Sequence, residues 1–322
     1  MILKIKQLHT YYKSKKNLLS KPTWNYALKD FNLEINQGDF IGIVGESGCG
    51  KTTLGNTIAG LIPPYKGEIL FKNQTILSSK INLLNKDLTL RRKIQMIFQD
   101  PYSSLNPKHK IKKILSSGLL LHKLVTPNYL NEKLEYILSL VHLNKNILER
   151  YPFELSGGQR QRIGIARAIS LDPEILICDE ITSALDVSVQ AYIINVLFEL
   201  KEKLNLTILF ITHDLSLVKY ISNTVCVMYG GEVLEIGSTK TIFSNPKHPY
   251  TKSLLNAIPT LNRKKKPILL EGEPPKVDTI HNDCIFYNRC PIKKEICKEK
   301  KPELYLISSN KEEKHYSKCF FN

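Results

Sequence analysis

The apolar residues of the first 245 positions follow two patterns, and both predict strands. Residues 2–5 and 31–35 alternate apolar and polar side chains, as half-buried strands do. Residues 40–44, 174–178 and 207–211 are almost continuously apolar. Continuous apolar runs are typical of strands that are covered on both faces, as in a mostly parallel sheet with helices on either side. The two patterns together predict an α/β fold.

A helical pattern separates these strand-rich regions. Its apolar positions recur at i, i+4, i+7, i+8 and i+11, in the order Leu130, Leu134, Ile137, Leu138 and Val141. This spacing places them on one face of a helix. We therefore expect a helical subdomain at about residues 105–165. Shorter apolar runs predict a strand at 67–72 and a hairpin at 225–236 that turns at Gly230–Gly231.

The run after the first buried strand fits a phosphate-binding loop. Residues 45–53 read GESGCGKTT, which contains a Gly, four residues and then Gly-Lys-Thr. Glycines let the backbone turn so that its N–H groups point at phosphate oxygens, and the helix that begins at Lys51 directs its positive end at the same place. Lys51 would reach the β- and γ-phosphates and Thr52 would bind Mg²⁺. The residues expected to contact a bound nucleotide here are Gly45, Glu46, Ser47, Gly48, Cys49, Gly50, Lys51, Thr52 and Thr53. A chance Gly-rich turn is the alternative.

Polar residues follow several of the predicted strands at their carboxyl ends, where ligands of open α/β sheets bind. These residues are Gln99, Asp179, Glu180 and His213. A second site for an anion is expected where Ser156, Gly157 and Gly158 precede a strong helix former. Near the N-terminus, Tyr11 and Tyr12 are either aromatics at a strand end or candidates for stacking on a nucleotide base.

Composition narrows the class of protein. The chain has 322 residues, of which 42% are apolar, enough for one large domain with an appendage or for two domains. No run reaches the roughly 18–20 apolar residues of a membrane span, and the first residues lack an apolar signal core. We therefore expect a cytosolic protein.

Charge and cysteines leave alternatives open. The net charge of +16 is compatible with nucleic acid or with an anionic lipid surface, but only 8 of the 46 basic residues are Arg and the Lys are spread along the chain. Cys49, Cys178 and Cys226 are expected to pack in the core. Four further thiols crowd the last 40 residues in an arrangement that suits an iron–sulfur cluster or tetrahedral zinc in a reducing compartment. These thiols are Cys284, Cys290, Cys297 and Cys319.

Taken in order, the motifs over residues 1–245 resemble the ATP-binding subunits of ABC transporters. They are the phosphate loop at 45–52, Gln99, LSGGQ at 155–159, Asp-Glu at 179–180, SALD at 183–186 and His213. The resemblance implies an α/β, P-loop ABC-type nucleotide-binding domain over 1–245. Such a domain has a mixed sheet core, an N-terminal antiparallel β subdomain and a helical signature subdomain. Residues 246–322 would form a small cysteine-containing C-terminal extension.

The resemblance also implies roles. Tyr12 would stack on adenine, and Thr52, Gln99 and Asp179 would hold Mg²⁺ directly or through water. Glu180 would be the general base that polarises water, and His213 would contact the γ-phosphate; the alternatives are a surface carboxylate and a structural histidine. The residues that would cap the γ-phosphate of ATP on the opposite subunit are Ser156, Gly157, Gly158 and Gln159. Asp186 belongs to the loop after the Asp-Glu pair. One departure is Ile181, which stands where the family usually has Pro.

The last quarter resembles one branch of that family. Residues 245–259, with 98–107 and 183–190, are similar to the oligopeptide/dipeptide importer ATPases, a group that includes some nickel importers. Residues 53–61 are more similar to the F-type subunit than to its D-type partner. In this group, C-terminal cysteines like these imply a four-iron, four-sulfur (4Fe-4S) cluster. Zinc and unligated thiols remain the alternatives.

These features predict an importer ATPase that is peripheral on the cytoplasmic face of the membrane. It would pair with a second such ATPase, either a copy or a paralogue, and act through two membrane permease subunits that are served by an extracytoplasmic peptide-binding protein. Those other chains would select the solute. The alternative is a soluble ABC ATPase that acts on nucleic acid or ribosomes. It is disfavoured because only one motif set exists and no heptads or paired Cys lie between Lys51 and Ser156.

Overall fold

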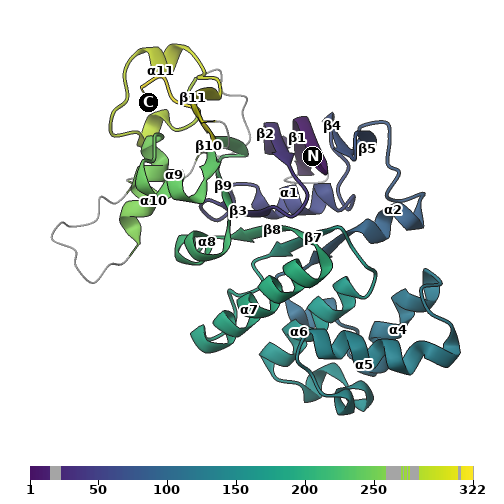
Figure 1. The fold of residues 1–322 in the computed structure, drawn as a ribbon. Helices are drawn as coiled ribbons and strands as arrows, with labels where there is room; N and C mark the ends of the chain where they lie inside the picture. The colour runs from purple at the N-terminus through teal and green to yellow at the C-terminus, as the bar shows by residue number, and fades with distance from the viewer. Residues whose placement is uncertain are drawn as a thin grey trace. The chain divides into compact units, whose positions relative to one another are not determined.

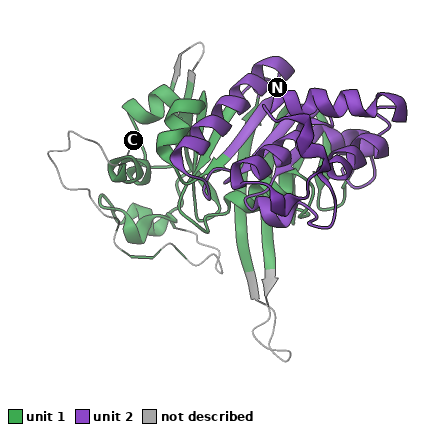
Figure 2. Ribbon diagram, turned by 90° about the horizontal axis from the view of Figure 1, so that it is seen from below, with its two compact units in different colours: residues 1–35, 40–82, 211–322 green, residues 36–39, 83–210 purple. Residues whose placement is uncertain are grey.

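The computed structural model of the chain describes residues 1–14, 23–258, 270, 272, 273, 275, 283–310 and 313–321 (Figure 1). The basic stretch 263–266 lies outside this part. The chain divides into two compact units (Figure 2). Unit 1 contains residues 1–35, 40–82 and 211–322, and unit 2 contains residues 36–39 and 83–210.

Unit 1 contains an antiparallel sheet with the strand order β2-β1-β4-β5. The strands are β1 (Leu3–Ser14), β2 (Thr23–Ile35), β4 (Lys66–Phe71) and β5 (Gln74–Ser78). Leu3 and Ile5 are buried while Lys4 between them is not, as the alternating pattern predicts. The expected N-terminal antiparallel sheet is therefore confirmed.

A second group of strands in unit 1 leads to the phosphate loop. Their order is β11-β12-β10-β9-β3, and β3 runs parallel to β9. The strands are β3 (Phe40–Val44), β9 (Thr224–Tyr229), β10 (Glu232–Ser238), β11 (Tyr305–Asn310) and β12 (Glu313–Ser317). All five residues of β3 are buried, as its continuous apolar run predicts, and β9 and β10 form the expected hairpin at Gly230–Gly231.

The helices of unit 1 follow these strands. They are α1 (Lys51–Ile58), α8 (Leu215–Ile221), α9 (Thr239–Ser244), α10 (Pro249–Ala257), the 3-10 turn η4 (Tyr287–Arg289) and α11 (Ile296–Glu299). A buried carboxylate joins α10 to the last strands: Glu235 accepts the backbone N–H groups of Lys247 and His248 at 2.7 and 2.9 Å and contacts the His315 ring at 2.7 Å. The described C-terminal residues are thus an integral part of unit 1.

Unit 2 combines parallel strands with a group of helices. Its strands are β6 (Ile94–Ile97), β7 (Ile175–Asp179) and most of β8 (Thr207–Thr212), in the order β8-β7-β6. Its longer helices are α4 (Ile111–Leu121), α5 (Leu130–Leu140), α6 (Gly157–Ile169) and α7 (Val187–Leu204). Its short elements are α2 (Leu88–Lys93), α3 (Pro101–Ser104), η1 (Pro127–Tyr129), η2 (Lys145–Glu149) and η3 (Pro152–Glu154).

The predicted helical region lies in unit 2. Leu134, Ile137 and Leu138 on α5 and Val141 just beyond it are buried, which confirms the apolar face predicted from their spacing. The exact limits of the subdomain, and the division of the chain at 245/246, stay predictions. Among the residues that the structure describes, no helix combines the length and apolar character needed to cross a bilayer.

Candidate ATP site

The phosphate loop connects β3 to α1, both in unit 1. Its glycines are required by conformation and by space. Gly45 and Gly50 have φ of 156° and 104°, and a Cβ atom would come within 2.2 Å of the Met228 carbonyl oxygen at the first and of the Ala27 carbonyl oxygen at the second. No other residue type fits these positions without moving neighbouring backbone. Ser47 and Gly48 at the tip of the loop are exposed and therefore accessible to a ligand.

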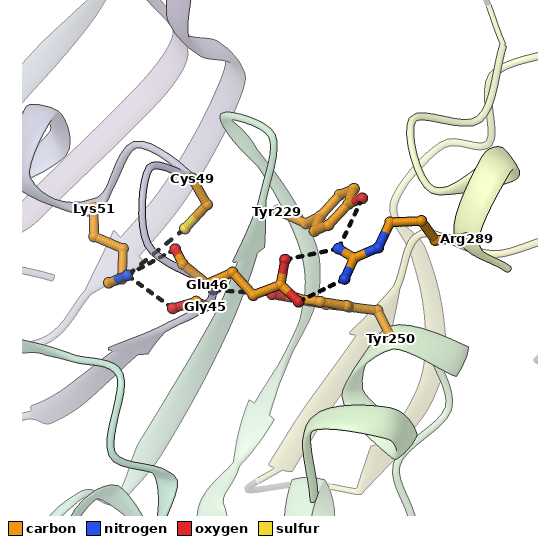
Figure 3. A network of polar contacts seen from close by, with 7 residues as sticks. All are labelled: Gly45, Glu46, Cys49, Lys51, Tyr229, Tyr250 and Arg289. Carbon is orange, nitrogen blue, oxygen red and sulfur yellow. Dashed lines mark hydrogen bonds and ion pairs between the residues drawn. The ribbon is translucent and has the colours of Figure 1, made fainter. Parts of the chain in front are cut away.

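Lys51 lies beneath this loop and is only 5% exposed. Its ammonium group donates to the carbonyl oxygens of Gly45 at 2.8 Å and Glu46 at 3.0 Å (Figure 3). The loop thus holds a cation next to backbone N–H groups at the start of a helix, an arrangement suited to an anion such as a phosphate. Cys49 is buried, and this burial raises the pKa of its thiol although nearby Lys51 opposes the shift.

Residues at the start of α1 connect the loop to the N-terminal sheet. Thr52 is exposed and Thr53 is buried. The Tyr12 hydroxyl on β1 lies 3.1 Å from Thr53 Oγ1, while 44% of the Tyr12 residue remains exposed. The aromatic residue expected to stack on a base is therefore anchored to the helix that follows the phosphate loop.

The Asp-Glu pair lies at the carboxyl end of β7 in unit 2. Asp179 is 2% exposed, and Glu180 follows with φ of 46°, a left-handed conformation that is unfavourable for a residue with a side chain. Gln99, just after β6, donates its amide N–H to Glu180 Oε2 at 3.1 Å. The structure thus brings together Gln99 and Glu180, two residues that the sequence places at strand carboxyl ends. Ile181 is 2% exposed, so it packs in the interior.

The signature residues form the start of α6 in unit 2. Ser156 is the N-cap: its hydroxyl accepts the Gln159 N–H at 3.3 Å, and the Gln159 side chain accepts the Ser156 N–H at 3.0 Å. A Cβ atom on Gly158 would lie 2.7 Å from Val189, whereas one on Gly157 would make an ordinary contact at 3.6 Å. The motif therefore specifies a capped, closely packed helix N-terminus. This geometry favours an anion at that end.

Two further predicted residues lie beside helix caps. Asp186 is the N-cap of α7 and accepts from Ser188 Oγ at 2.6 Å and from the Val189 N–H at 2.9 Å. These two bonds lower the pKa of Asp186. His213 is exposed and follows β8, just before Asp214, the N-cap of α8. His213 belongs to unit 1 with the phosphate loop and Tyr12, whereas Gln99, Asp179, Glu180, Asp186 and the signature belong to unit 2.

The four C-terminal cysteines line one pocket of unit 1, together with His248 and Phe286. Burial raises the pKa of Cys284 to about 12 and also raises the pKa values of Cys290 and Cys319. Among the described residues, no group of three or more His, Cys, Asp or Glu side chains is arranged to hold a metal ion. The structure thus gathers the cysteines without showing the four-thiolate metal site that the sequence suggested. The other three cysteines are buried, as expected.

Three residues around the loop were not anticipated from the sequence. Arg289 of η4 forms an ion pair with the Glu46 carboxylate, and the hydroxyl groups of Tyr229 and Tyr250 lie in the same network (Figure 3). Glu46 and Arg289 are 243 positions apart. The sequence feature that could have drawn attention to Arg289 is the rarity of arginine, which accounts for only 8 of the 46 basic residues.

Three features define an ABC-type ATP-binding protein. They are a glycine-rich phosphate loop after a parallel strand, a carboxylate pair after another strand and a Ser-Gly-Gly helix N-terminus. Comparison with known families gives the same class. The family described as "ABC transporter" matches residues 28–183, and the one described as "Oligopeptide/dipeptide transporter, C-terminal region" matches residues 234–297. The chain therefore belongs to the ABC ATPases, in the group with the oligopeptide/dipeptide C-terminal region, and is an ATP-hydrolysing transporter subunit.

Curated relatives support this membership over most of the chain. The oligopeptide transport ATP-binding protein AppF of Bacillus subtilis is 44% identical over 94% of this chain and 93% of that protein. The dipeptide transport ATP-binding protein DppF of Haemophilus influenzae is 42% identical over 92% and 90%, respectively. The oligopeptide transport ATP-binding protein OppF of Salmonella typhimurium is 42% identical over 86% and 84%.

Solved structures show the same fold. The ATP-binding cassette MJ0796, in a dimeric post-hydrolysis state bound to ADP and Pi, has a TM-score of 0.63 and 29% identity, covering 72% of this chain and 96% of that chain. The cbiO1 protein of Clostridium perfringens, part of the cbiONQ transporter complex, has a TM-score of 0.64 and 30% identity over 76% and 91%. The predicted ABC ATPase fold, with its mixed sheet and helical part, is therefore confirmed.

Proposed function

We propose that this chain is the ATP-hydrolysing subunit of an importer for oligopeptides or dipeptides. The observation that carries the proposal is the similarity to peptide-transport ATP-binding proteins over more than nine-tenths of the chain, including the C-terminal region. The F-type relatives AppF, DppF and OppF suggest that this chain is the F-type subunit. An importer of the same group for nickel is the alternative, and the relatives do not favour action on nucleic acid.

In unit 1, residues 45–53 would bind the phosphates of ATP and Tyr12 would stack on the base. Lys51 would place its positive charge against the β- and γ-phosphates, since its ammonium group already lies below the loop. His213 would contact the γ-phosphate. These roles agree with the exposure of Ser47, Gly48, Thr52 and Tyr12 and with the close backbone packing at the glycines.

The roles proposed in hydrolysis follow from the functional groups of the residues at the start of α1 and at the strand ends. Thr52, Gln99 and Asp179 offer oxygen donors, which are the ligands that suit Mg²⁺, so these residues would hold that ion. When bound, Mg²⁺ would neutralise charge on the phosphate oxygens. Glu180 would orient a water molecule and accept its proton, and the Gln99 amide at 3.1 Å would hold the carboxylate in position.

A second ATPase subunit would complete the site. One phosphate loop with its metal and base leaves the γ-phosphate exposed on one side, and a capped helix N-terminus from another subunit can supply the missing positive end. Ser156, Gly157, Gly158 and Gln159 would play this part for ATP bound to the partner. Asp186 would support them, since it accepts the N–H of Val189, the residue against which Gly158 packs. The dimeric state described for the cassette MJ0796 supports the pairing of two ATPase subunits. Two permease subunits would anchor the ATPase pair at the cytoplasmic face of the membrane.

Uptake in membrane vesicles tests the proposed function. The chain is combined with its partner ATPase, the permease subunits and the binding protein of the same system. We expect ATP-dependent accumulation of a labelled dipeptide or tripeptide, which is lost with Lys51→Ala. The control Lys203→Ala, an exposed surface substitution on α7, should leave uptake intact. Accumulation of labelled Ni²⁺ instead of either peptide would replace the peptide proposal with the nickel alternative.

We further propose that the cysteine pocket holds a 4Fe-4S cluster. A zinc ion requires four sulfur atoms at about 2.3 Å from one point, whereas a cluster is held by more widely separated thiolates. Four cysteines around one pocket supply the thiolates that either group needs, and similarity to the oligopeptide/dipeptide group, where the resemblance of these cysteines implies a cluster, is the reason for choosing 4Fe-4S. The ligands would be Cys284, Cys290, Cys297 and Cys319, and the role would be structural.

Metal and sulfide analysis of anaerobically purified protein tests this assignment. We expect a brown protein with equal amounts of iron and acid-labile sulfide, and loss of both when Cys284 and Cys297 are replaced by Ser. The matched control is Cys178→Ala, since Cys178 is buried in unit 2 and is not one of the pocket-lining residues. A colourless protein with one zinc ion per chain would show that zinc occupies the pocket.

A further inference from the structure

Every polar group of Glu46 in the phosphate loop is held by a named partner (Figure 3). Its carboxylate accepts hydrogen bonds from Arg289 Nη1 at 2.7 Å and Nη2 at 3.0 Å. Its backbone N–H donates to the Tyr250 hydroxyl at 3.0 Å, and its carbonyl oxygen accepts from Lys51 at 3.0 Å. Two of these partners come from the C-terminal region, so residues far along the chain fix the first turn of the phosphate loop.

The pair between Arg289 and Glu46 is sheltered from solvent. The Arg289 side chain is 7% exposed and the Glu46 side chain 25% exposed, and both guanidinium Nη atoms bond to the two carboxylate oxygens. The Tyr229 hydroxyl lies 3.3 Å from Nη1. Planar, two-pronged pairs of this kind are stronger and more directional than exposed ion pairs. Bonding to Glu46 accordingly raises the pKa of Arg289 above its already high usual value.

A cluster of buried aromatic side chains around Phe286 holds the residues that bond to Glu46 and Arg289 in place. The ring of Phe286 lies 5.3 Å from Tyr229, 5.4 Å from Tyr250 and 5.6 Å from His248, measured between ring centroids. Phe286, Tyr229 and Tyr250 are each at most 1% exposed. The tyrosine hydroxyl groups and the η4 turn that carries Arg289 therefore have little freedom to move away from Glu46.

We propose that Arg289 is a positioning residue for nucleotide binding, acting on the phosphate loop through Glu46 with Tyr250 as a second support. The pair does two things. It fixes the peptide unit that precedes the loop tip, and it neutralises a carboxylate that the phosphate loop itself carries. The inference rests on the proposed ATP-binding function and extends it to a residue of the C-terminal region.

The charge of Glu46 distinguishes two possible roles of Arg289: positioning the phosphate loop, or merely attaching the C-terminal region to the rest of unit 1. Without Arg289, the Glu46 charge would repel the triphosphate. Removing that charge as well should then restore binding. If Arg289 only attached the C-terminal region to unit 1, a second substitution at Glu46 would restore nothing.

Titration of the full-length chain with nucleotide measures how each substitution changes the affinity for ATP. We expect Arg289→Ala to weaken binding of a fluorescent ATP analogue about tenfold, equivalent to about 1.4 kcal/mol. The loss should be larger at 50 mM than at 300 mM salt, because salt screens the repulsion. The double variant Arg289→Ala, Glu46→Gln should recover most of the affinity. Arg289→Lys keeps the charge and should fall between wild type and Arg289→Ala. In turnover assays the effect should appear in KM more than in kcat.

The matched control is Lys301→Ala, which removes an ion pair with Glu232 from the same C-terminal region without touching the phosphate loop. Thermal unfolding of every variant identifies those that fold. If Arg289→Ala is unfolded, the comparison is made with Arg289→Lys and its Glu46→Gln double variant. Affinity of the Arg289 variants equal to wild type, or a loss that Glu46→Gln fails to relieve, overturns the inference. Failure of the wild-type chain to bind the analogue would instead contradict the proposed function.

Discussion

Replacing Glu180 with Gln should abolish steady-state ATP hydrolysis, with a fall in kcat of at least about 10²-fold. The substitution keeps the size of the side chain and leaves an amide that can still pair with Gln99, which lies 3.1 Å from Glu180 Oε2. What it removes is the group that accepts a proton from water. ATP binding should therefore remain, and the ATP-bound dimer should accumulate because the step that dissociates it is blocked. Phosphate release and size-exclusion chromatography with ATP measure the two effects.

The other end of the same strand provides the control. Glu174 precedes β7 and pairs with Lys93 at 3.2 Å, so Glu174→Gln removes a carboxylate next to the same strand without touching the strand end. We expect this control to keep hydrolysis within about twofold of wild type, as is usual for substitutions away from the reacting groups. Near-normal turnover in Glu180→Gln would mean that another group accepts the proton.

Sequence patterns predicted those features that depend on local chemistry. The loop at 45–53 was predictable because its glycines satisfy a backbone path that only glycine follows, as Gly45 and Gly50 show. The cap at Ser156 was foreseeable for the same reason, since cap and helix are adjacent in the chain. The places of Gln99 and Glu180 at strand carboxyl ends were also predictable, because ligands of open α/β sheets bind there. Their hydrogen bond to each other is a finding of the structure.

Features that depend on distant residues were not predictable in this way. No local pattern signals that Arg289 bonds to Glu46, because the pair depends on how β9, α10 and η4 pack around Phe286. The left-handed backbone at Glu180 is likewise set by its surroundings and not by residue type. For the cysteines, spacing predicted their common pocket but not the positions of their sulfur atoms, since side-chain packing decides those positions.

An arginine at position 156 should damage the ATP site of the partner and not that of the chain that carries it. Ser156 caps α6, so Ser156→Arg removes a cap worth about 1 kcal/mol and places a bulky side chain where the γ-phosphate of the partner's ATP would lie. In a dimer with one altered subunit, photolabelling with an azido-ATP analogue should fall at least about tenfold on the unaltered subunit. The altered subunit should keep its own label, because its phosphate loop and the partner's signature are intact.

Two further variants make this result interpretable. Lys51→Ala should show the opposite pattern, because Lys51 serves the phosphate loop of its own chain. Ser139→Arg places the same side chain at an exposed position on α5 and should change neither label. If Ser156→Arg instead removed the label of its own subunit, each nucleotide pocket would be built within a single chain. ATP could not then join two subunits, so the dimer would need another source of stability and hydrolysis another way of separating it.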